Sequence, residues 1–403
     1  SWSVALDTDE SIFGLMPYPK WLVMALEAPG ITKYFHNATF ELTLLKRDGV
    51  AVNNVHDTKL MAWLLGESNT SLKALAAQRL GRVSPDLTTL ITKAQLAAGL
   101  SLLDTATLDA VKDYALQDAE NTFRLAELFD AEMARRPTLV RLYEAIEQPL
   151  MSVLSDMMLR GIGIDREAAA VFARELEESI AQVRDALPME NPNSGPQVQR
   201  LLYDTLGLPV VAYTPTGQRS TRKKHIEELD SPVVESLLEY RELTKLLGTY
   251  VRTLATHPTE RLHVSFNQSG TYQSEALGAP RTGRLSSSKP MNLMNIPQKT
   301  EIGRRVKALF VPSPGYLFWR VDYDQLELRI LAARAEELTM LDAFRTEKDL
   351  HALTASAIFN VAVPTKEQRY VGKQANFATI YGASVPRLME VTGLDREGAV
   401  RVQ

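Results

Sequence analysis

The sequence has 403 residues, of which 45% are hydrophobic and 23% are charged, so it predicts a folded protein with a core and, by its length, two to four domains. It contains no cysteine, which excludes a disulfide framework, a thiolate nucleophile and a zinc site with Cys ligands, and it has no apolar run long enough to span a bilayer. The formal net charge is −4 at pH 7, so any contact with nucleic acid must come from local clusters of Lys and Arg.

The first 137 residues alternate strand and helix patterns, which predicts an α/β layered domain. The predicted strands lie at residues 2–6, 11–16 and 32–35, and the predicted helices at residues 20–26, 57–65 and 105–135. The first two strands form a hairpin that turns at residues 7–10. Because the sequence opens on Ser1 within a strand and shows no signal peptide, we expect it to be part of a longer gene product.

Residues 138 to about 260 have a mostly helical pattern. One periodic helix is predicted at residues 144–159, with Gly161 after its end, and another at residues 231–247. The loop between them carries four cations, Arg219, Arg222, Lys223 and Lys224. This loop is either a solvated surface loop or one that follows a phosphate backbone.

Residues 316–321 form a β-rich run that ends on Asp322, and residues 326–345 and 364–381 have helical patterns. Asp322 opens the string D-Y-D-Q-L-E-L-R, in which a strand delivers a carboxylate where a helix starts. A carboxylate in that place can hold Mg²⁺ for phosphoryl transfer. It can equally cap the N-terminus of the helix.

A stripe of four residues recurs every fourth position in the second helical region: Arg369, Lys373, Phe377 and Tyr381, followed by Gly382. On a helix this spacing places two cations and two aromatic rings along one face. Such a face suits a nucleoside triphosphate, because the cations can meet the phosphates and the rings can meet the base. The alternative is an amphipathic helix with a buried aromatic end and a solvated basic end.

The string at Asp322 and the stripe resemble the first and second motifs of family A DNA polymerases, the DNA polymerase I type, and lie about fifty residues apart as in that family. Residues 282–287 (T-G-R-L-S-S) and 292–297 (N-L-M-N-I-P) resemble a further stretch, in which the arginine, here Arg284, reaches the minor groove at the primer terminus. All base pairs offer similar acceptors there, so a donor can sense pairing without reading sequence. Weaker resemblances to the family lie at residues 143–165, 214–229, 240–246 and 349–351.

The resemblance covers essentially the whole chain and implies a multidomain fold of α/β and α+β type. An RNase H-like 3′–5′ exonuclease-type domain is followed by a right-hand polymerase fold. The expected domains are an exonuclease-like domain at residues 1–137, whose first strand is missing, a thumb with the palm-entry helix at 138–262, a partial palm at 263–345 and incomplete fingers at 346–403.

The resemblance also implies site residues. Asp322, the catalytic carboxylate, and the backbone carbonyl of Tyr323 are expected to hold metal, with two Mg²⁺ ions as the cofactor of the intact enzyme. Glu327 is the expected steric gate that excludes a ribose 2′-hydroxyl, with Tyr381 beside it. The expected dNTP site comprises Arg369, Lys373, Phe377, Tyr381, His351, Gln325 and Glu327. The expected DNA contacts are Arg284, Asn292, Asn295, Arg219, Arg222, Lys223, Lys224 and Lys245.

The sequence departs from the family pattern in several places. Asp324 replaces the usual Ser and adds a negative charge near the metals, Met294 replaces the usual Gln, and residues 272–279 lengthen a loop. Phe377 in place of Tyr predicts poor acceptance of nucleotides that lack a 3′-hydroxyl. The third motif, H-D-E, is absent, and one carboxylate is a poor cage for two Mg²⁺ ions. We therefore expect this chain alone to bind little metal and not to polymerise.

The first domain carries partial exonuclease motifs. Glu41 stands where the family has Asp, Asp57 opens the following helix, and Tyr114 and Asp118 match the Y-x3-D motif. Residues 7–9 (D-T-D) are either a hairpin turn or the D-x-E metal motif, and their short spacing to Glu41 favours the turn. Glu41 is one methylene longer than Asp, which should shift a metal by about 1 Å and cost rate. Proofreading is therefore doubtful.

The leading hypothesis is template-directed DNA synthesis, with primer–template DNA and dNTPs as partners, by a monomer without membrane contact. The alternative is a non-catalytic module that binds primer–template DNA, which the missing third motif favours for this chain. A third hypothesis, a protein with exonuclease activity alone, is weak because it would give no function to the thumb and palm sequences. The expected location is the cytoplasm of a bacterial or phage-infected cell, with an organelle as the other possibility.

Overall fold

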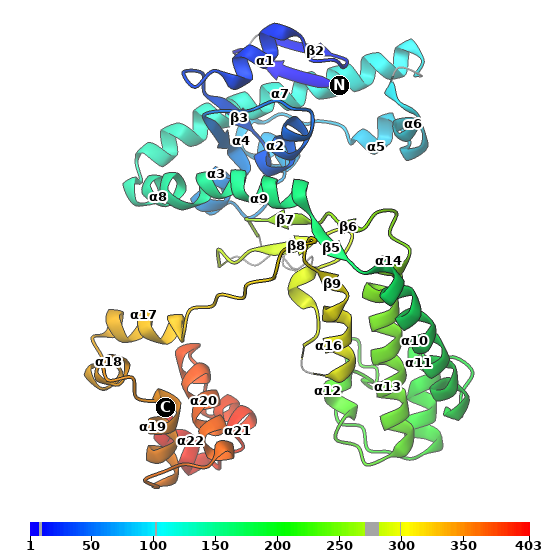
Figure 1. Ribbon diagram of the computed structural model, residues 1–403, viewed down its shortest axis with the longest axis vertical. Helices are drawn as coiled ribbons and strands as arrows, with labels where there is room; N and C mark the ends of the chain where they lie inside the picture. Colours follow the sequence, from blue (N-terminus) through cyan, green and yellow to red (C-terminus); the bar gives the residue numbers. More distant parts are fainter. Residues whose placement is uncertain (8–9, 101–102, 271–281, 299) are drawn as a thin grey trace. The chain divides into compact units, whose positions relative to one another are not determined.

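A computed structural model describes residues 1–7, 10–100, 103–270, 282–298 and 300–403. The chain divides into two compact units, Ser1–Leu317 and Phe318–Gln403 (Figure 1). The four domains expected from the resemblance stay a prediction, because this division does not test them. None of the helices in the described ranges combines the length and the apolar character needed to cross a bilayer.

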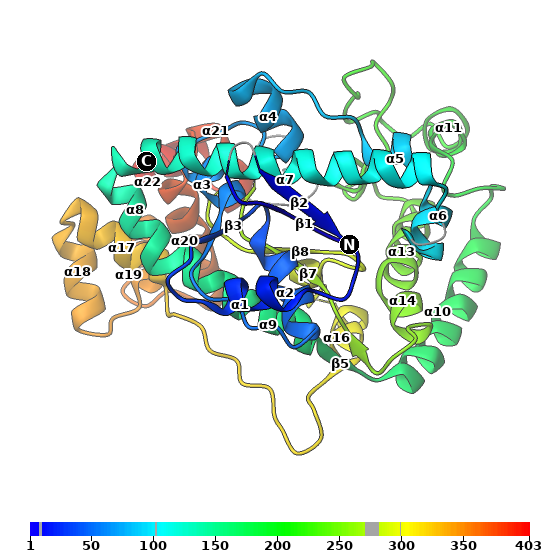
Figure 2. The ribbon, with the colours of Figure 1, turned by 90° about the horizontal axis from the view of Figure 1, so that it is seen from above.

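The N-terminal part mixes short strands with helices, as predicted. Its elements are β1 (Trp2–Ala5), β2 (Ser11–Gly14), α1 (Lys20–Glu27), β3 (Lys33–Phe35), α2 (Ala38–Arg47), β4 (Val55–Asp57), α3 (Thr58–Leu65), α4 (Leu72–Leu80), α5 (Leu87–Leu90), α6 (Lys93–Ala98) and α7 (Thr105–Ala134). β1 and β2 pair antiparallel, which confirms the hairpin, and β3 and β4 pair parallel. α7 runs along β1 and β2 (Figure 2). Its Leu125 and Phe129 are fully buried in a core shared with α3 and α4.

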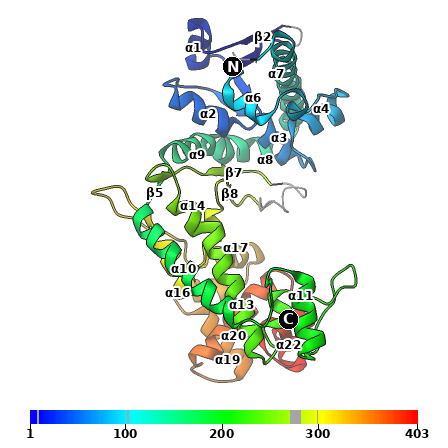
Figure 3. The ribbon, with the colours of Figure 1, turned by 90° about the vertical axis from the view of Figure 1, so that its right-hand side faces the viewer.

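The following stretch is helical. Its elements are α8 (Pro137–Leu142), the π-helical turn η2 (Tyr143–Glu147), α9 (Gln148–Arg160), α10 (Arg166–Ala186), α11 (Gly195–Gln199), η3 (Arg200–Thr205), α12 (Lys223–Ile226), α13 (Pro232–Leu246), η4 (Leu247–Val251) and α14 (Arg252–Ala255). α9 ends where predicted, because Gly161 takes a φ of +63° that favours glycine. α13 begins at Pro232, as predicted. α10 and α13 lie side by side (Figure 3) and share a core with η4 and α14.

Two small sheets complete the first unit. Their strands are β5 (Ile162–Ile164), β6 (Arg261–Leu262), β7 (Ser265–Asn267), β8 (Ser286–Ser288) and β9 (Phe310–Val311), and η5 (Leu293–Asn295) and α16 (Glu301–Ala308) lie between β8 and β9. β5 is the central strand between β6 and β9, and β7 pairs antiparallel with β8. Glycine is required at Gly163 in β5, because a Cβ there would lie 2.5 Å from the Val311 carbonyl oxygen.

The second unit is a group of six helices within its described residues. They are α17 (Leu326–Ala335), α18 (Leu338–Arg345), α19 (Leu350–Phe359), α20 (Lys366–Ile380), α21 (Val385–Thr392) and α22 (Arg396–Val402). The predicted helical regions at 326–345 and 364–381 are thus confirmed, with a break between α17 and α18. α19 and α20 approach closely at Gly372, where a Cβ would lie 2.4 Å from the His351 carbonyl oxygen. Leu328, Ala343 and Leu350 form the buried core of α17, α18 and α19.

The predicted strand at residues 316–321 is wrong. This segment has no strand assignment, and its Leu317, Trp319 and Val321 side chains are 83%, 88% and 88% exposed. A strand is held by hydrogen bonds to a neighbouring strand. No strand among the described residues pairs with this segment, so its β-branched and aromatic content alone does not fix the backbone.

Candidate active site

The string that begins at Asp322 forms an exposed turn before α17. Asp322 and Tyr323 directly precede this turn, which Asp324 and Gln325 form, and both are exposed. Gln325 closes the turn in the left-handed conformation, with φ of 51° and ψ of 38°, and occupies the N-cap position of α17. The alternative that Asp322 caps the helix is therefore wrong. The turn instead leaves the Asp322 carboxylate open to solvent ahead of the helix.

Asp324 is held by Arg329. The Arg329 Nε donates to the Asp324 carbonyl oxygen over 2.8 Å, and its Nη2 donates to Asp324 Oδ2 over 3.1 Å. The Arg329 guanidinium also lies 4.6 Å from the centre of the Phe344 ring. Hydrogen bonds from Arg329 and then from Gln325 lower the pKa of Asp324. The extra negative charge in the string is thus paired with an arginine that is anchored on an aromatic ring.

The stripe of cations and rings lies on α20, as predicted. Arg369 and Lys373 are exposed, and Phe377 is half-buried with its ring centre 5.8 Å from that of His351. Tyr381 follows the last helical residue and is 67% exposed. Its hydroxyl donates to Glu327 Oε2 over 2.6 Å. This bond joins the end of the stripe to the first turn of α17, so two segments 54 residues apart meet at one place.

His351 lies beneath the stripe and is only 4% exposed. Burial lowers its pKa, so the ring is neutral at pH 7. Asn376 Nδ2 lies 3.0 Å from His351 Nδ1, and Thr354 Oγ1 donates to Asn376 Oδ1 over 2.9 Å. With the amide nitrogen as donor, Nδ1 accepts and the ring proton lies on Nε2. No motif in the sequence singles out Asn376, which is one position from Phe377 and off the stripe.

Asp349 connects α19 to the stripe. Its Oδ1 accepts the His351 and Ala352 N–H groups and so caps α19. Its Oδ2 accepts from Arg369 Nε over 2.5 Å. Arg369 is therefore oriented by an ion pair. Lys373 lies one turn further along the helix and is also exposed. Both cations lie on one face of the helix, which is the arrangement that phosphate binding requires.

The candidate DNA contacts of the first unit surround β8. Arg284 is exposed and precedes β8 by two residues. Asn292 is half-buried, and its Oδ1 accepts from Met294 N over 2.9 Å, so its side chain caps η5. Asn295 is exposed, and its carbonyl oxygen accepts from the Tyr250 hydroxyl over 2.8 Å. The 272–279 insertion lies outside the described residues.

The basic loop splits into paired and exposed cations. Arg219 donates twice to Asp204, over 2.5 Å and 2.8 Å, and lies 5.2 Å from the centre of the Tyr203 ring. Three of the predicted loop cations and one on α13 are exposed: Arg222, Lys223, Lys224 and Lys245. Arg219 therefore shapes the loop through Asp204, and the exposed cations are the ones available to phosphates.

Two of the candidate exonuclease carboxylates, Glu41 and Asp57, lie within the fold of the exonuclease-like part. Burial raises the pKa of Glu41 to about 8, so Glu41 is mostly uncharged at pH 7. Asp57 is 2% exposed and accepts three backbone N–H bonds, from Asn37, Ala38 and Lys59. These bonds cap the N-termini of both α2 and α3. The Asp57 carboxylate is thus committed to local structure, whereas the Glu41 Oε2 is buried without a hydrogen-bond partner.

The other two candidates lie on α7. The Tyr114 hydroxyl bonds to Asp118, Lys73 Nζ lies 5.3 Å from the Tyr114 ring centre, and burial raises the pKa of Asp118. Tyr114 also lines a pocket of about 540 Å³. In the described part of the chain, no three His, Asp or Glu side chains form a group that could hold a metal ion.

The D-T-D segment supports the turn interpretation as far as it is described. Asp7 Oδ1 accepts from the Glu10 N–H, three residues further on, over 2.7 Å, a contact across the turn of the hairpin. Thr8 and Asp9 lie outside the described residues. As far as the exonuclease-like part is described, its candidate carboxylates are not gathered into the two-metal cage that such chemistry needs.

Comparison with known proteins places both parts of the chain. The family model for DNA polymerase family A matches residues 165–403, and the model for 3′–5′ exonuclease matches residues 16–134. The chain is 36% identical over 389 residues to DNA polymerase I of Chloroflexus aurantiacus, covering 92% of this chain and 40% of that protein. It is 34% identical over 412 residues to DNA polymerase I of Pseudomonas aeruginosa, covering 98% of this chain and 43% of that protein.

A thermostable relative and a solved structure agree with these matches. Thermostable DNA polymerase I of Thermus filiformis is 36% identical over 370 residues, covering 88% of this chain and 40% of that protein. The chain thus spans about two fifths of the length of these relatives. The POL domain of Pol1 from M. smegmatis, in complex with DNA primer-template and dNTP, matches with a TM-score of 0.76 and 29% identity, over 94% of this chain and 64% of that one. The chain, an exonuclease-type domain followed by polymerase sequence, belongs to DNA polymerase family A.

Proposed function

We propose that the protein to which this chain belongs is a DNA-directed DNA polymerase that adds dNTPs to a primer 3′-hydroxyl. The observation that carries this proposal is the hydrogen bond between Tyr381 and Glu327, which joins the cation–aromatic stripe of α20 to the turn that presents Asp322. The M. smegmatis Pol1 domain, a structural match, is solved with primer-template and dNTP. A site with phosphate-binding cations, rings and a carboxylate suits the same ligands.

The proposed site residues of the second unit then have distinct roles. Arg369 and Lys373 bind the triphosphate, Phe377 and Tyr381 pack against the base, and Glu327 closes the space beside the sugar. Tyr381 holds the Glu327 carboxylate through its hydroxyl, so the gate is fixed before a nucleotide arrives. The remaining members of the proposed dNTP site are Gln325, in the turn, and His351, which offers an Nε2–H donor.

Asp322 and the backbone carbonyl of Tyr323 are the residues of this chain that would hold Mg²⁺. Two such ions would activate the primer hydroxyl and stabilise charge on the phosphates. Asp324 does not add a ligand, because Arg329 already binds its carboxylate. Of the two aspartates in the string, Asp322 alone is then left for a metal ion, and we expect the 403-residue chain not to extend a primer by itself.

On the DNA side, we propose that Arg284, Asn292 and Asn295 contact the duplex near the primer terminus. The exposed cations Arg222, Lys223, Lys224 and Lys245 are the proposed phosphate contacts, with Arg219 ordering the loop through Asp204. We propose no editing activity, because Glu41 is buried and Asp57 is saturated by backbone donors. We further propose a monomer in the bacterial cytoplasm, where chromosomal DNA and dNTPs are found.

A non-catalytic module that binds primer–template DNA is the second candidate. The observation that favours it is the single free carboxylate in the site. Such a module would use the same cations to bind DNA, and it would order a dNTP without joining it to a primer.

Primer extension by the full-length protein separates the two candidates. The variants are Asp322→Ala and, as a matched control, Asp342→Ala, an exposed aspartate of α18 that pairs with Lys348. We expect the full-length protein and the control to extend a primer and Asp322→Ala to lose activity by at least a thousandfold. A full-length protein that binds primer–template DNA but adds no nucleotide would establish the non-catalytic module.

A further inference from the structure

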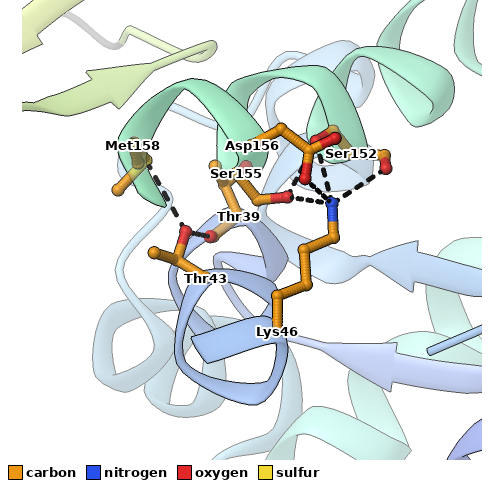
Figure 4. A network of polar contacts seen from close by, with 7 residues as sticks. All are labelled: Thr39, Thr43, Lys46, Ser152, Ser155, Asp156 and Met158. Atoms are coloured by element: carbon orange, nitrogen blue, oxygen red, sulfur yellow. Dashed lines mark hydrogen bonds and ion pairs between the residues drawn. The ribbon is translucent and has the colours of Figure 1, made fainter. Parts of the chain in front are cut away.

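The helix formed by η2 and α9 contacts the exonuclease-like part, residues 1–134, and also the segment of β6 and β7 within the polymerase sequence. On one side it receives Lys46 from α2 (Figure 4). Lys46 Nζ donates to the Ser152 carbonyl and hydroxyl oxygens, each over 3.1 Å, to Ser155 Oγ over 2.7 Å and to Asp156 Oδ1 over 2.6 Å. The Lys46 side chain is 22% exposed. One largely covered ammonium group therefore joins α2 to two turns of α9.

Other bonds on the same side extend this contact. The Asp57 N–H donates to the Tyr143 hydroxyl over 2.9 Å, and Tyr143 is 3% exposed within the core of the exonuclease-like part. Gln148 Nε2 donates to the Val55 carbonyl oxygen over 2.8 Å. The contacts thus run from the start of η2 to the last turns of α9.

The other side of the same helix holds β6 and the end of β7. Gln268 Nε2 donates to the carbonyl and side-chain oxygens of Glu147, each over 2.9 Å, and both residues are buried. Arg261 Nε donates to the Arg160 carbonyl oxygen over 2.7 Å, and His263 Nδ1 lies 2.9 Å from the Met158 carbonyl oxygen. β7 pairs with β8, the strand that Arg284 precedes.

We propose that the exonuclease-like part has a further function as a brace: through Lys46 and the η2–α9 helix, it holds the β7–β8 pair in place. This function needs no metal ligand, so it does not depend on the Glu41 and Asp57 carboxylates. Loss of Lys46 removes four hydrogen bonds and leaves their acceptors to be rehydrated. The α9 backbone then has more freedom, and so have the strands bonded to its other side.

Hydrogen exchange of the 403-residue chain tests the brace directly. The variants are Lys46→Met and, as a matched control, Arg47→Met, which removes the neighbouring cation of α2, whose ion pair is with Asp48. We expect Lys46→Met to raise exchange at least tenfold in α9 and in the amides of β7 and β8, and Arg47→Met to leave both unchanged. Unchanged exchange in β7 and β8 of Lys46→Met would overturn the proposal.

A second variant covers the case in which Lys46→Met does not fold. Asp156→Asn changes a side chain that is 59% exposed and removes one charged acceptor of Lys46. It should raise exchange in the same segments by a smaller factor. The absence of any change outside α2 and α9 in this variant would also overturn the brace.

The consequence for DNA rests on the proposed function, because it assumes that Arg284 and Asn292 contact the duplex. The affinity of the full-length protein for primer–template DNA should fall several-fold with Lys46→Met and stay unchanged with Arg47→Met. Equal affinities with raised exchange would overturn this extension to DNA. If the unmodified protein binds no DNA, the proposed function fails, whereas the exchange experiment still decides the brace.

Discussion

At the scale of single residues, the candidate carboxylates differ in whether they already accept hydrogen bonds from the protein. Asp322 is exposed ahead of the turn, whereas Asp57 accepts three backbone N–H bonds and Asp324 is bound by Arg329. A carboxylate that already accepts hydrogen bonds has fewer lone pairs left for a metal ion. The sequence could not make this distinction, because all three look alike as letters in a motif.

Asp324→Asn tests whether Asp324 positions the turn or binds metal. The amide keeps the shape and an acceptor but loses the charged bond to Arg329, which contributes little to stability at an exposed site. We expect primer extension by the full-length protein to fall less than tenfold, with an unchanged dependence on Mg²⁺ concentration. A large rise in the Mg²⁺ concentration needed for activity would show that Asp324 is a metal ligand.

Glu41 predicts a pH dependence of stability. Its pKa is raised from 4.5 to about 8 in the folded chain. Between these two pH values the unfolded state therefore binds fewer protons than the folded state. The contribution of Glu41 to stability is therefore complete below about pH 4.5 and is lost as pH rises through 8, by at most about 1.4 kcal/mol per pH unit.

The variant Glu41→Gln removes this dependence. Relative to the unmodified chain, it should gain stability steadily from pH 5 to pH 8, as followed by thermal unfolding. A difference that does not vary with pH would mean that Glu41 is charged in the folded chain. In that case its carboxylate would again be a candidate metal ligand.

At the scale of elements, the helix stripe was more predictable than the strand. The period of four residues in Arg369, Lys373, Phe377 and Tyr381 depends only on local geometry, so the sequence predicts α20 correctly. The β-rich run at 316–321 depends on a partner strand, which local sequence does not specify, and that prediction is wrong. The meeting of Tyr381 with Glu327 came from the family resemblance, because nothing local predicts a contact across 54 residues.

The contact between α19 and α20 sets the position of the stripe. A Cβ at Gly372 would lie 2.4 Å from the His351 carbonyl oxygen and 2.9 Å from Ala355 N, both backbone atoms. Gly372→Ala should therefore push the helices apart and cost about 1–3 kcal/mol of stability. The matched control is Gly248→Ala in η4, where nothing lies within 4 Å of the new Cβ. Helix propensity makes that change neutral or stabilising.

Thermal unfolding followed by circular dichroism would report both glycine variants. A destabilised Gly248→Ala together with an unaffected Gly372→Ala would contradict the packing described for these helices. Because His351 and Phe377 lie at the same contact, Gly372→Ala should also weaken dNTP binding by the full-length protein.

At the scale of the whole molecule, the chain combines the proposed nucleotide site with an exonuclease-like part in whose described residues no group of three His, Asp or Glu side chains could hold a metal ion. Family membership follows from the match over residues 165–403. The relatives are more than twice as long as this chain, so polymerase activity is proposed for the full-length protein. Within the first unit, the exonuclease-like part contacts α9, and the sequence could not predict these contacts. Lys46, Ser152 and Asp156 look like ordinary surface residues when they are read one by one.

The most direct test of the central claim is the ratio of dNTP to rNTP incorporation by the full-length protein and by Glu327→Ala. If Glu327 and Tyr381 form the wall of a deoxynucleotide site on α17 and α20, the unmodified protein prefers dNTPs, and the variant loses most of that preference, on the order of a hundredfold. A variant that extends primers with the same preference as the unmodified protein would contradict the site described here.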